Sequence, residues 1–196
     1  GDASGANSGI TIAASPTGYS RVHFADANSG AARYAGFIAY YHTDDAILFG
    51  TNNSGSEKVR ITSTGAVTKP QQPYVRINGI TNTGGSGNSN SGTATTYGAI
   101  TYSNGRVTAQ VEGKYLITFA YISDSGTGRV DGHIRVNGSN ILNTLTSDNG
   151  SGYRQKSASI VYHLNVNDYV EWSNADWYVP TNTTTEWKTA SVYMLG

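Results

Sequence analysis

The 196-residue chain contains no cysteine, so no disulfide bond contributes to its fold, which argues against a small secreted animal domain. It has no apolar run of 18 residues, which excludes a transmembrane helix. Charged residues make up only 13% of the chain and balance to a formal net charge of zero. Proteins that bind nucleic acid or anionic membranes carry a basic surplus. We therefore expect no nucleic-acid partner and no membrane insertion.

Helix-forming patterns are also missing, because no window of a dozen residues keeps an apolar period of 3.6. What the chain has instead is 24 glycines, 14 tyrosines and abundant serine, threonine and asparagine. This composition is typical of short strands joined by many turns. The sequence therefore predicts an all-β fold.

The most continuous apolar run lies within residues 105–122. Alternation with a period of two divides it into two faces. One face holds Tyr115, Ile117, Phe119 and Tyr121. The other holds Leu116, Thr118, Ala120 and Ile122. Because neither face carries a charge or an amide, we expect both to be covered: one by a second sheet, the other by a further layer of this chain or by a neighbouring subunit.

Changes in composition divide the chain into four parts. Residues 1–9 are small and polar, and we expect a linker or a cloning remnant. Residues 10–69 contain short strand-like pieces with few large aliphatics, as expected of a β-rich stalk or collar stabilised by identical chains. Two prolines mark residues 70–73 as a linker, and residues 74–196 form a head. The only methionine is Met194, so we expect a processed product or, preferably, a fragment of a longer protein.

The stalk carries an ordered series of motifs at Ser20–Asp26, Arg33–His42, Ile47–Thr51 and Lys58–Gly65. This series resembles the segment that precedes the terminal domain in many bacteriophage tail-fibre proteins. That family usually continues with a Gly-Ile-Gly-type sequence, whereas residues 66–70 read Ala-Val-Thr-Lys-Pro here. The shaft is therefore expected to end at this point and to give way to the head.

In the head, residues 81–96 are predicted to form a long mobile loop, because they are polar with one aliphatic. Asn104-Gly105 and Asn137-Gly138 predict tight hairpins, since both central positions of a type I′ turn need a positive φ. Eight strands are expected after this loop: Gly98–Tyr102, Arg106–Gln110, Lys114–Ile122, Arg129–Val136, Asn140–Thr144, Ala158–Leu164, Tyr169–Ser173 and Glu186–Leu195. Eight strands with regular turns favour a jelly-roll sandwich.

The head also resembles the C1q/TNF-like jelly roll, through Gly105–Phe119, Ile134–Gly138, Ser159–Trp172 and Ala190–Leu195. It departs from that family where Asn167 replaces the usual glycine of a turn, and it lacks the usual Phe-Ser-Gly-Phe close. The resemblance implies a homotrimer. It also implies that the long strand lines the threefold axis, with Leu116, Thr118, Ala120 and Ile122 as the trimer interface.

Catalytic and metal motifs are sparse. The carboxylates are mostly isolated in turns, the histidines lack metal-ligand spacing, and no serine lies in a Gly-x-Ser-x-Gly elbow. His163 alternates with Val161 and is predicted to pack on a strand. Asp124, Asp131 or Asp148 would be the candidates for a calcium ion, but one carboxylate per loop favours turn formation. We expect no enzyme activity, no metal and no cofactor.

The stronger functional signal lies in residues 174–182. Trp177 and Tyr178 stand there among Asp176 and Asn174, and flat rings beside amides and carboxylates suit a sugar. Tyr153, in the polar stretch 148–154, is a second candidate ligand-binding residue. The competing interpretation is that these rings pack in the fold or across the trimer. Trp172 alternates with Val170 and is expected in the core.

The two resemblances together imply a virion tail-fibre adhesin that acts outside the host cell as a homotrimer, and the aromatic stretch favours a bacterial surface polysaccharide or lipopolysaccharide as its ligand. A purely structural trimerisation and folding cap is the main alternative. A polysaccharide depolymerase and an animal C1q-like extracellular protein are weaker alternatives.

Overall fold

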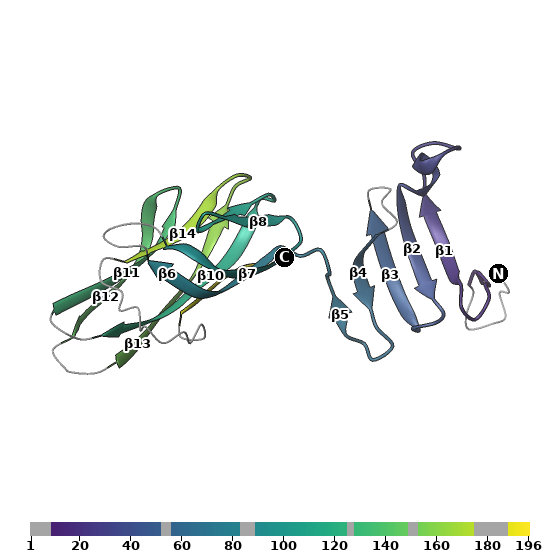
Figure 1. Cartoon of the computed structure of the whole chain (residues 1–196). Coiled ribbons are helices and arrows are strands. Elements are labelled where there is room, and N and C mark those ends of the chain that lie inside the picture. The colour runs from purple at the N-terminus through teal and green to yellow at the C-terminus, as the bar shows by residue number, and fades with distance from the viewer. Residues whose placement is uncertain (1–8, 52–55, 83–88, 125–127, 149–152, 175–187) are drawn as a thin grey trace. The chain divides into compact units, whose positions relative to one another are not determined.

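The computed structural model describes residues 9–51, 56–82, 89–124, 128–148, 153–174 and 188–196. The chain divides into two compact units, Gly1–Pro70 and Gln71–Gly196. Both are built from antiparallel strands, as the sequence predicted (Figure 1).

The first unit is a single five-stranded meander, in which each strand pairs with the next along the chain. Its strands are β1 (Tyr19–Phe24), β2 (Gly36–Tyr41), β3 (Ala46–Thr51), β4 (Glu57–Ile61) and β5 (Val67–Thr68), with a 3₁₀ turn, η1 (Ala31–Tyr34), before β2. Residues 10–13 begin the stretch in which strand-like pieces were expected, but they are not in a strand. No second sheet or helical layer covers this sheet among the described residues of the unit.

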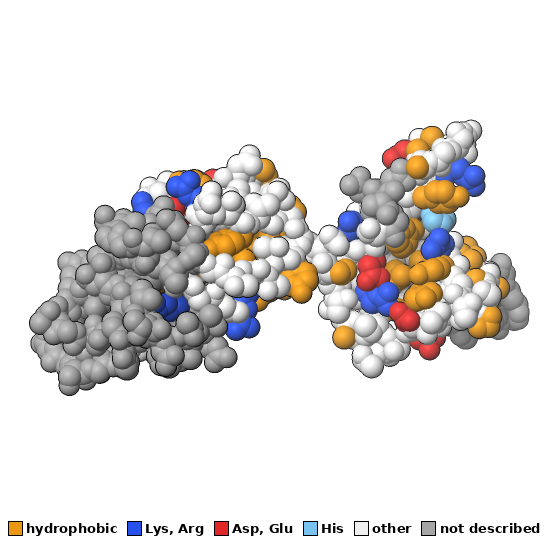
Figure 2. Space-filling view, viewed as in Figure 1, with side chains coloured by type: hydrophobic (Ala, Val, Ile, Leu, Met, Phe, Trp, Pro, Cys, Tyr) orange, Lys and Arg blue, Asp and Glu red, His pale blue; other side chains and the backbone are white. Residues whose placement is uncertain are grey.

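One face of this sheet carries a small core of Ala39, Ala46 and Leu48, flanked by the rings of Phe37 and Tyr41. The same face is polar at its margin. Arg60 lies opposite Leu48 and forms ion pairs of 2.9 Å with both Asp44 and Glu57. Figure 2 shows charged side chains of both signs among hydrophobic ones on this unit. Side chains of the unit itself, in a small core and two ion pairs, therefore stabilise this face.

The second unit has ten strands in its described part: β6 (Tyr74–Asn82), β7 (Ser89–Tyr97), β8 (Ile100–Ser103), β9 (Arg106–Ala109), β10 (Gly113–Asp124), β11 (Gly128–Val136), β12 (Ser139–Asp148), β13 (Tyr153–Leu164), β14 (Tyr169–Asn174) and β15 (Thr189–Met194). They form two five-stranded sheets, in the orders β13-β10-β15-β6-β7 and β12-β11-β14-β9-β8. This is a TNF/C1q-like jelly-roll sandwich.

The core lies between these two sheets, and β10 contributes its predicted inner face. Tyr115, Ile117, Phe119 and Tyr121 are essentially fully buried. Trp172 of β14 is also fully buried, which confirms its expected place in the core. The period-two pattern therefore divided the strand into its two faces correctly, and the inward face is the one that the resemblance left for the core.

The prediction of a long loop over residues 81–96 is wrong for its described part. β6 extends to Asn82, and Ser89–Tyr97 form β7, which pairs antiparallel with β6 from Tyr74 opposite Tyr97 onwards. β7 is the edge of its sheet, and its side chains are exposed or only partly buried where they are described. Because an edge strand buries little, threonine and serine suffice, and hydropathy does not identify the strand.

The turns have the expected backbone. Asn104 and Gly105 have φ values of 50° and 75°, and Asn137 and Gly138 have 51° and 80°, as a type I′ turn requires. Asn167, which stands where the resembled family has glycine, has a φ of 73°. Asparagine tolerates this left-handed conformation, so the substitution preserves the turn.

Candidate binding end and subunit surface

The strands that flank the candidate loops have their ends at one end of the head. Within the first sheet Asp124 lies opposite Tyr153, and within the second Gly128 lies opposite Asp148. Only residues 125–127 join β10 to β11, and only 149–152 join β12 to β13, so these ends of the two sheets adjoin. Asn174 lies opposite Gly132 on β11, so the connection between β14 and β15 leaves from the same end.

The predicted glycan-binding residues fall at or beyond these strand ends. Trp177, Tyr178 and Asp176 lie outside the described residues. Asn174 is the last residue of β14 and Tyr153 the first of β13. The expectation that Asn174 and Tyr153 belong to loops is therefore wrong by a residue or more, because the polar strands run further than hydropathy suggested.

The predicted subunit surface is the outer face of the sheet that contains β10. Leu116, Thr118 and Ala120 are only partly buried there, while the side chain of Ile122 lies outside the description. Thr118 is hydrogen-bonded to Ser191 of β15, with 2.7 Å between the hydroxyl oxygens. Next to them a shallow hollow is lined by Thr118–Ala120 and by Ser157–Ser159 of β13. The middle of this face is thus made of small, largely hydroxyl-bearing residues.

An apolar row crosses the same face at the level of Leu116, and sequence reasoning missed most of it. Pairing places Val161, Leu116, Tyr193, Tyr74 and Tyr97 side by side across the five strands. Val161 is 53% exposed and Tyr97 57% exposed in the single chain. These residues are far apart in sequence, so only the register could have revealed the row.

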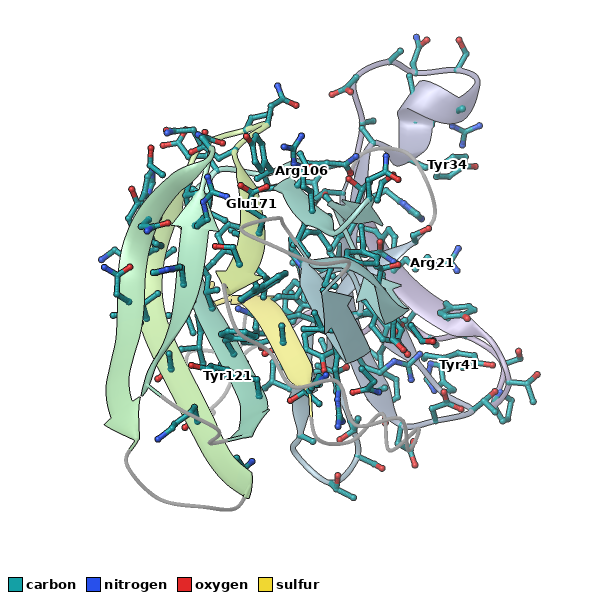
Figure 3. The ribbon with its side chains drawn as sticks, turned by 60° about the vertical axis from the view of Figure 1, so that its left-hand side comes forward. Arg21, Tyr34, Tyr41, Arg106, Tyr121 and Glu171 are labelled. Carbon is teal, nitrogen blue, oxygen red and sulfur yellow. The ribbon has the colours of Figure 1, made fainter. Side chains whose placement is uncertain are left out.

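The other sheet of the head, β12-β11-β14-β9-β8, holds a buried carboxylate between two arginines. Glu171 is 1% exposed, and its oxygens lie 3.1 Å from Nε of Arg106 and 3.3 Å from a terminal nitrogen of Arg135. Arg106 also stacks over the Tyr169 ring, with its guanidinium carbon 4.3 Å from the ring centre. Figure 3 shows Arg106 and Glu171 side by side. Because Arg106 lies on β9 and Arg135 on β11, the Glu171 carboxylate joins both strands to β14.

At the opposite end of the head, Asp168 fixes the turn between β13 and β14. Its carboxylate accepts hydrogen bonds from Nδ2 of Asn137 at 2.7 Å and from the backbone N–H of Asn165 at 2.8 Å. These bonds favour the ionised form and lower the pKa of Asp168. The side chain therefore acts as a clamp between two turns.

We expect Asp168→Asn to make the thermal stability of the head depend less steeply on pH below 4. Because the folded-state pKa lies below the ordinary value of 3.8, the carboxylate stabilises the fold fully above that value. This stabilisation is lost as the pH falls through the folded-state pKa. The thermal midpoint of the parent protein should therefore fall more steeply below pH 4 than that of Asp168→Asn. Asp26→Asn, in the other unit, serves as the control, and equal slopes for the parent and Asp168→Asn would contradict the clamp.

Further features of the described residues bear on the expectations for metal ions, membrane helices and His163. They contain no group of three His, Asp or Glu side chains arranged to hold a metal ion. No helix among them has the length and hydropathy needed to cross a membrane. His163 is exposed, 3.3 Å from Glu112, so the prediction that it packs is wrong: it lies on the open face of β13.

Comparison with known proteins identifies the fold of the head but gives no function. No protein-family model and no curated protein matches the sequence. Among solved structures, murine APRIL matches at pH 5.0 with a TM-score of 0.55 and 12% identity, covering 63% of this chain and 99% of that one. The structures of murine APRIL at pH 8.5 and pH 8.0 match with TM-scores of 0.51 and 0.50, at 12% and 11% identity and the same coverage. At such identities the likeness establishes a shared TNF-type jelly roll and nothing further.

Proposed function

We propose that this chain is the tip of a homotrimeric bacteriophage tail fibre, which binds a bacterial surface polysaccharide or lipopolysaccharide without catalysis. Residues 74–196 would form the receptor-binding head and residues 10–69 a stalk. The protein would be part of the virion and act outside the host cell. Weak binding at each site would be strengthened by the three copies in each fibre.

The observation that carries the proposal is the convergence of strand ends at one end of the head. The stretches that contain Trp177, Tyr178 and Asp176, and the strand starting at Tyr153, all begin or end there. Rings and amides carried on stretches that leave from this end would suit a sugar, whose C–H face stacks on a ring while its hydroxyls bond to amides. Binding residues are typically carried on such loops.

The homotrimer is supported by the outer face of the β10 sheet. Its apolar row, which includes Val161, Leu116 and Tyr193, is uncovered in the single chain. Contiguous exposed apolar rows usually mark contact surfaces. We propose that this row, together with Thr118, Ala120 and Ile122, contacts the neighbouring subunits.

Absence of catalysis is part of the proposal. A glycosidase needs two carboxylates about 5–10 Å apart in a groove. The most buried carboxylate in the described part of the head, Glu171, is occupied by Arg106 and Arg135. Release of reducing sugar from purified host polysaccharide would overturn this part of the proposal and identify a depolymerase.

We expect Trp177→Ala to weaken binding of the full chain to polysaccharide from the host bacterium. Loss of a stacking ring at a binding hot spot costs about 2 kcal/mol, which is roughly a 30-fold increase in the dissociation constant per site. Surface plasmon resonance on immobilised polysaccharide would measure it, with light scattering to show an unchanged mass.

Tyr34→Ala is the matched control, because Tyr34 is an exposed ring on η1 of the other unit. It should bind as the parent does. If Trp177→Ala and Tyr153→Ala both bind as the parent does while the mass is unchanged, these residues are not the site. A parent protein that fails to bind host cells at all would leave the structural cap as the function.

A further inference from the structure

The second face of the β1–β5 sheet is apolar and uncovered. Pairing aligns two rows across the strands. They consist of Val22, Ile38, Phe49 and Val59, and of Ser20, Tyr40, Ile47, Ile61 and Val67. Neither row contains a charged residue, and the large side chains are exposed or only partly buried.

The unit has too little core to be stable with this face in water. Its fully buried apolar side chains among the described residues are Ala39, Ala46 and Leu48. A sheet normally buries one face against a second layer, and domains form from two such layers. Here the better-packed face is the one with Arg60, Asp44 and Glu57 at its margin. No strand or helix among the described residues of the unit lies over the apolar face. The missing layer must therefore come from outside the unit.

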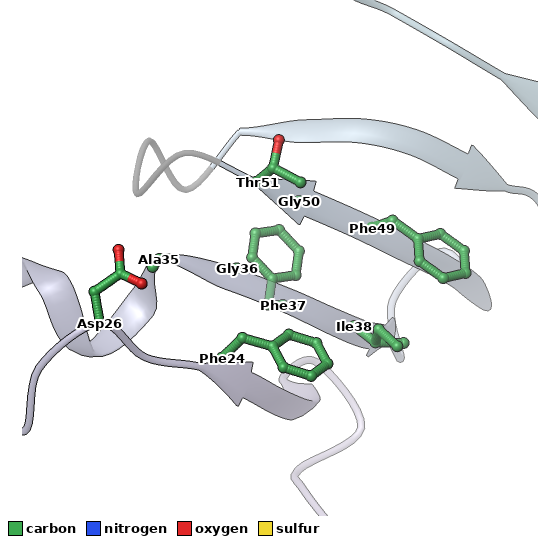
Figure 4. Close-up of a pocket in the computed structure, with 9 residues that line it drawn as sticks. All are labelled: Phe24, Asp26, Ala35, Gly36, Phe37, Ile38, Phe49, Gly50 and Thr51. Atoms are coloured by element: carbon green, nitrogen blue, oxygen red, sulfur yellow. The ribbon is translucent and has the colours of Figure 1, made fainter.

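The face also has a recess. Gly36 lies between Phe24 and Thr51 in the pairing and has no side chain to fill its place. The resulting hollow, of about 580 Å³, is flanked by Phe24, Ile38 and Phe49 (Figure 4). Its lining also includes Asp26 and Thr51, but three large apolar side chains flank it, so its open mouth suits an inserted aliphatic or aromatic side chain.

The size of the face limits what can cover it. Four strands spaced about 4.8 Å apart, with a fifth short one, and about 18 Å long present roughly 350 Å². This is comparable to the largest apolar patch of an ordinary monomer. Three such faces together give roughly 1,000 Å², the lower bound for a specific interface. One copy of the face is therefore too small to hold a partner alone, and three are sufficient only when other contacts keep the chains together.

We propose that this face packs against the same face of two further copies of the chain, so that three β1–β5 sheets enclose a shared apolar core. The inference deepens the proposed function, on which it depends for the number of copies and for the head contacts that raise the effective concentration. Each copy would place side chains of the Val22–Val59 row into the recess beside Gly36 of a neighbour.

A second copy is favoured over an unrelated partner because the cover is needed for the unit to fold. Whatever covers the face must be present in equal amount whenever the chain is made. Further copies of the same chain always meet that condition, whereas an unrelated partner does not. The two apolar rows themselves carry no charge, so apposing them to those of a copy brings no like charges of the rows together; the nearby carboxylates, Asp26 in the recess and Asp45 bonded to Tyr40, lie beside the rows.

The absence of cysteine allows a direct test in the full chain. Ile38→Cys and Tyr19→Cys place a thiol on opposite faces of the sheet, at side chains that are each 41% exposed in the single chain. If the face is covered, a maleimide should label Ile38→Cys at least tenfold more slowly than Tyr19→Cys. Light scattering on the same samples gives the number of copies.

Copper-catalysed oxidation to a disulfide then tests whether the same face of another copy covers the sheet. Val22→Cys, Ile38→Cys and Phe49→Cys, tested one at a time, should include at least one that gives a two-chain band on a denaturing gel. Equal labelling rates in a trimer overturn this inference and leave the trimeric head intact, whereas a monomeric mass overturns the trimer itself. Slow labelling without any two-chain band shows that something other than the same face of a second copy covers the sheet, which also overturns the inference.

Discussion

Val161→Glu is expected to reduce the mass of the protein in solution from about three times 20.7 kDa to that of one chain. Val161 belongs to the apolar row on the outer face of the β10 sheet, opposite Leu116. A penalty of about 3 kcal/mol for a glutamate buried at each of three copies raises the trimer dissociation constant by roughly four million-fold. The small face of the β1–β5 sheet could not hold three chains at micromolar concentration by itself. Light scattering at a fixed concentration would measure the change.

Val166→Glu is the control for this experiment. Val166 is 52% exposed, against 53% for Val161, but it lies between β13 and β14 and outside the apolar row. The same charge at the same exposure should leave the trimer intact there. A trimeric Val161→Glu, or a parent protein that is already monomeric, would show that this row is not a subunit contact.

Glu171→Ala is expected to destabilise the head by about 3 kcal/mol. Removing one member of a buried ion pair usually lowers the free energy of unfolding by roughly 3–5 kcal/mol, because the remaining charge loses its partner. The lower end applies, because the Arg106 side chain is 47% exposed and can be hydrated after the change. Urea unfolding followed by tryptophan fluorescence would report it, since buried Trp172 adjoins Glu171.

Glu112→Ala tests whether burial causes the effect. The Glu112 side chain is 64% exposed beside His163, and exposed ion pairs contribute at most about 1 kcal/mol. Both variants should be unfolded at the same protein concentration, because subunit association shifts apparent stability. Equal losses for Glu112→Ala and Glu171→Ala would mean that the two arginines do not stabilise the buried carboxylate.

The sequence predicted those parts of the fold in which each strand has one dry face. Alternation of Tyr115, Ile117 and Phe119 with smaller residues is strong because the inner face of β10 is completely buried. The Asn-Gly turns were predictable because few residue pairs accept two positive φ values. β7 was not, because an edge strand buries too little for hydropathy to detect.

The candidate surfaces were harder to predict for a different reason. Val161, Tyr193 and Tyr97 come from strands up to a hundred residues apart, and only pairing brings them into one row. In the first unit, the sequence did not show which face of the sheet holds the small core of Ala39, Ala46 and Leu48. The margin formed by Arg60 with Asp44 and Glu57 makes that distinction, and it depends on geometry.

The position of β15 has a consequence for biosynthesis. β15 lies between β10 and β6 in its sheet, yet it follows both of them in the chain. On the ribosome, β6 and β10 must therefore wait for residues 189–194 before their sheet can close, whereas β1–β5 pair in the order in which they emerge. Non-local pairing of this kind slows folding and leaves strand edges open in the meantime. A nascent head thus passes through a stage at which Ile117 and Val75 lack their shared partner, Val192, so the middle of the future sheet has two open strand edges.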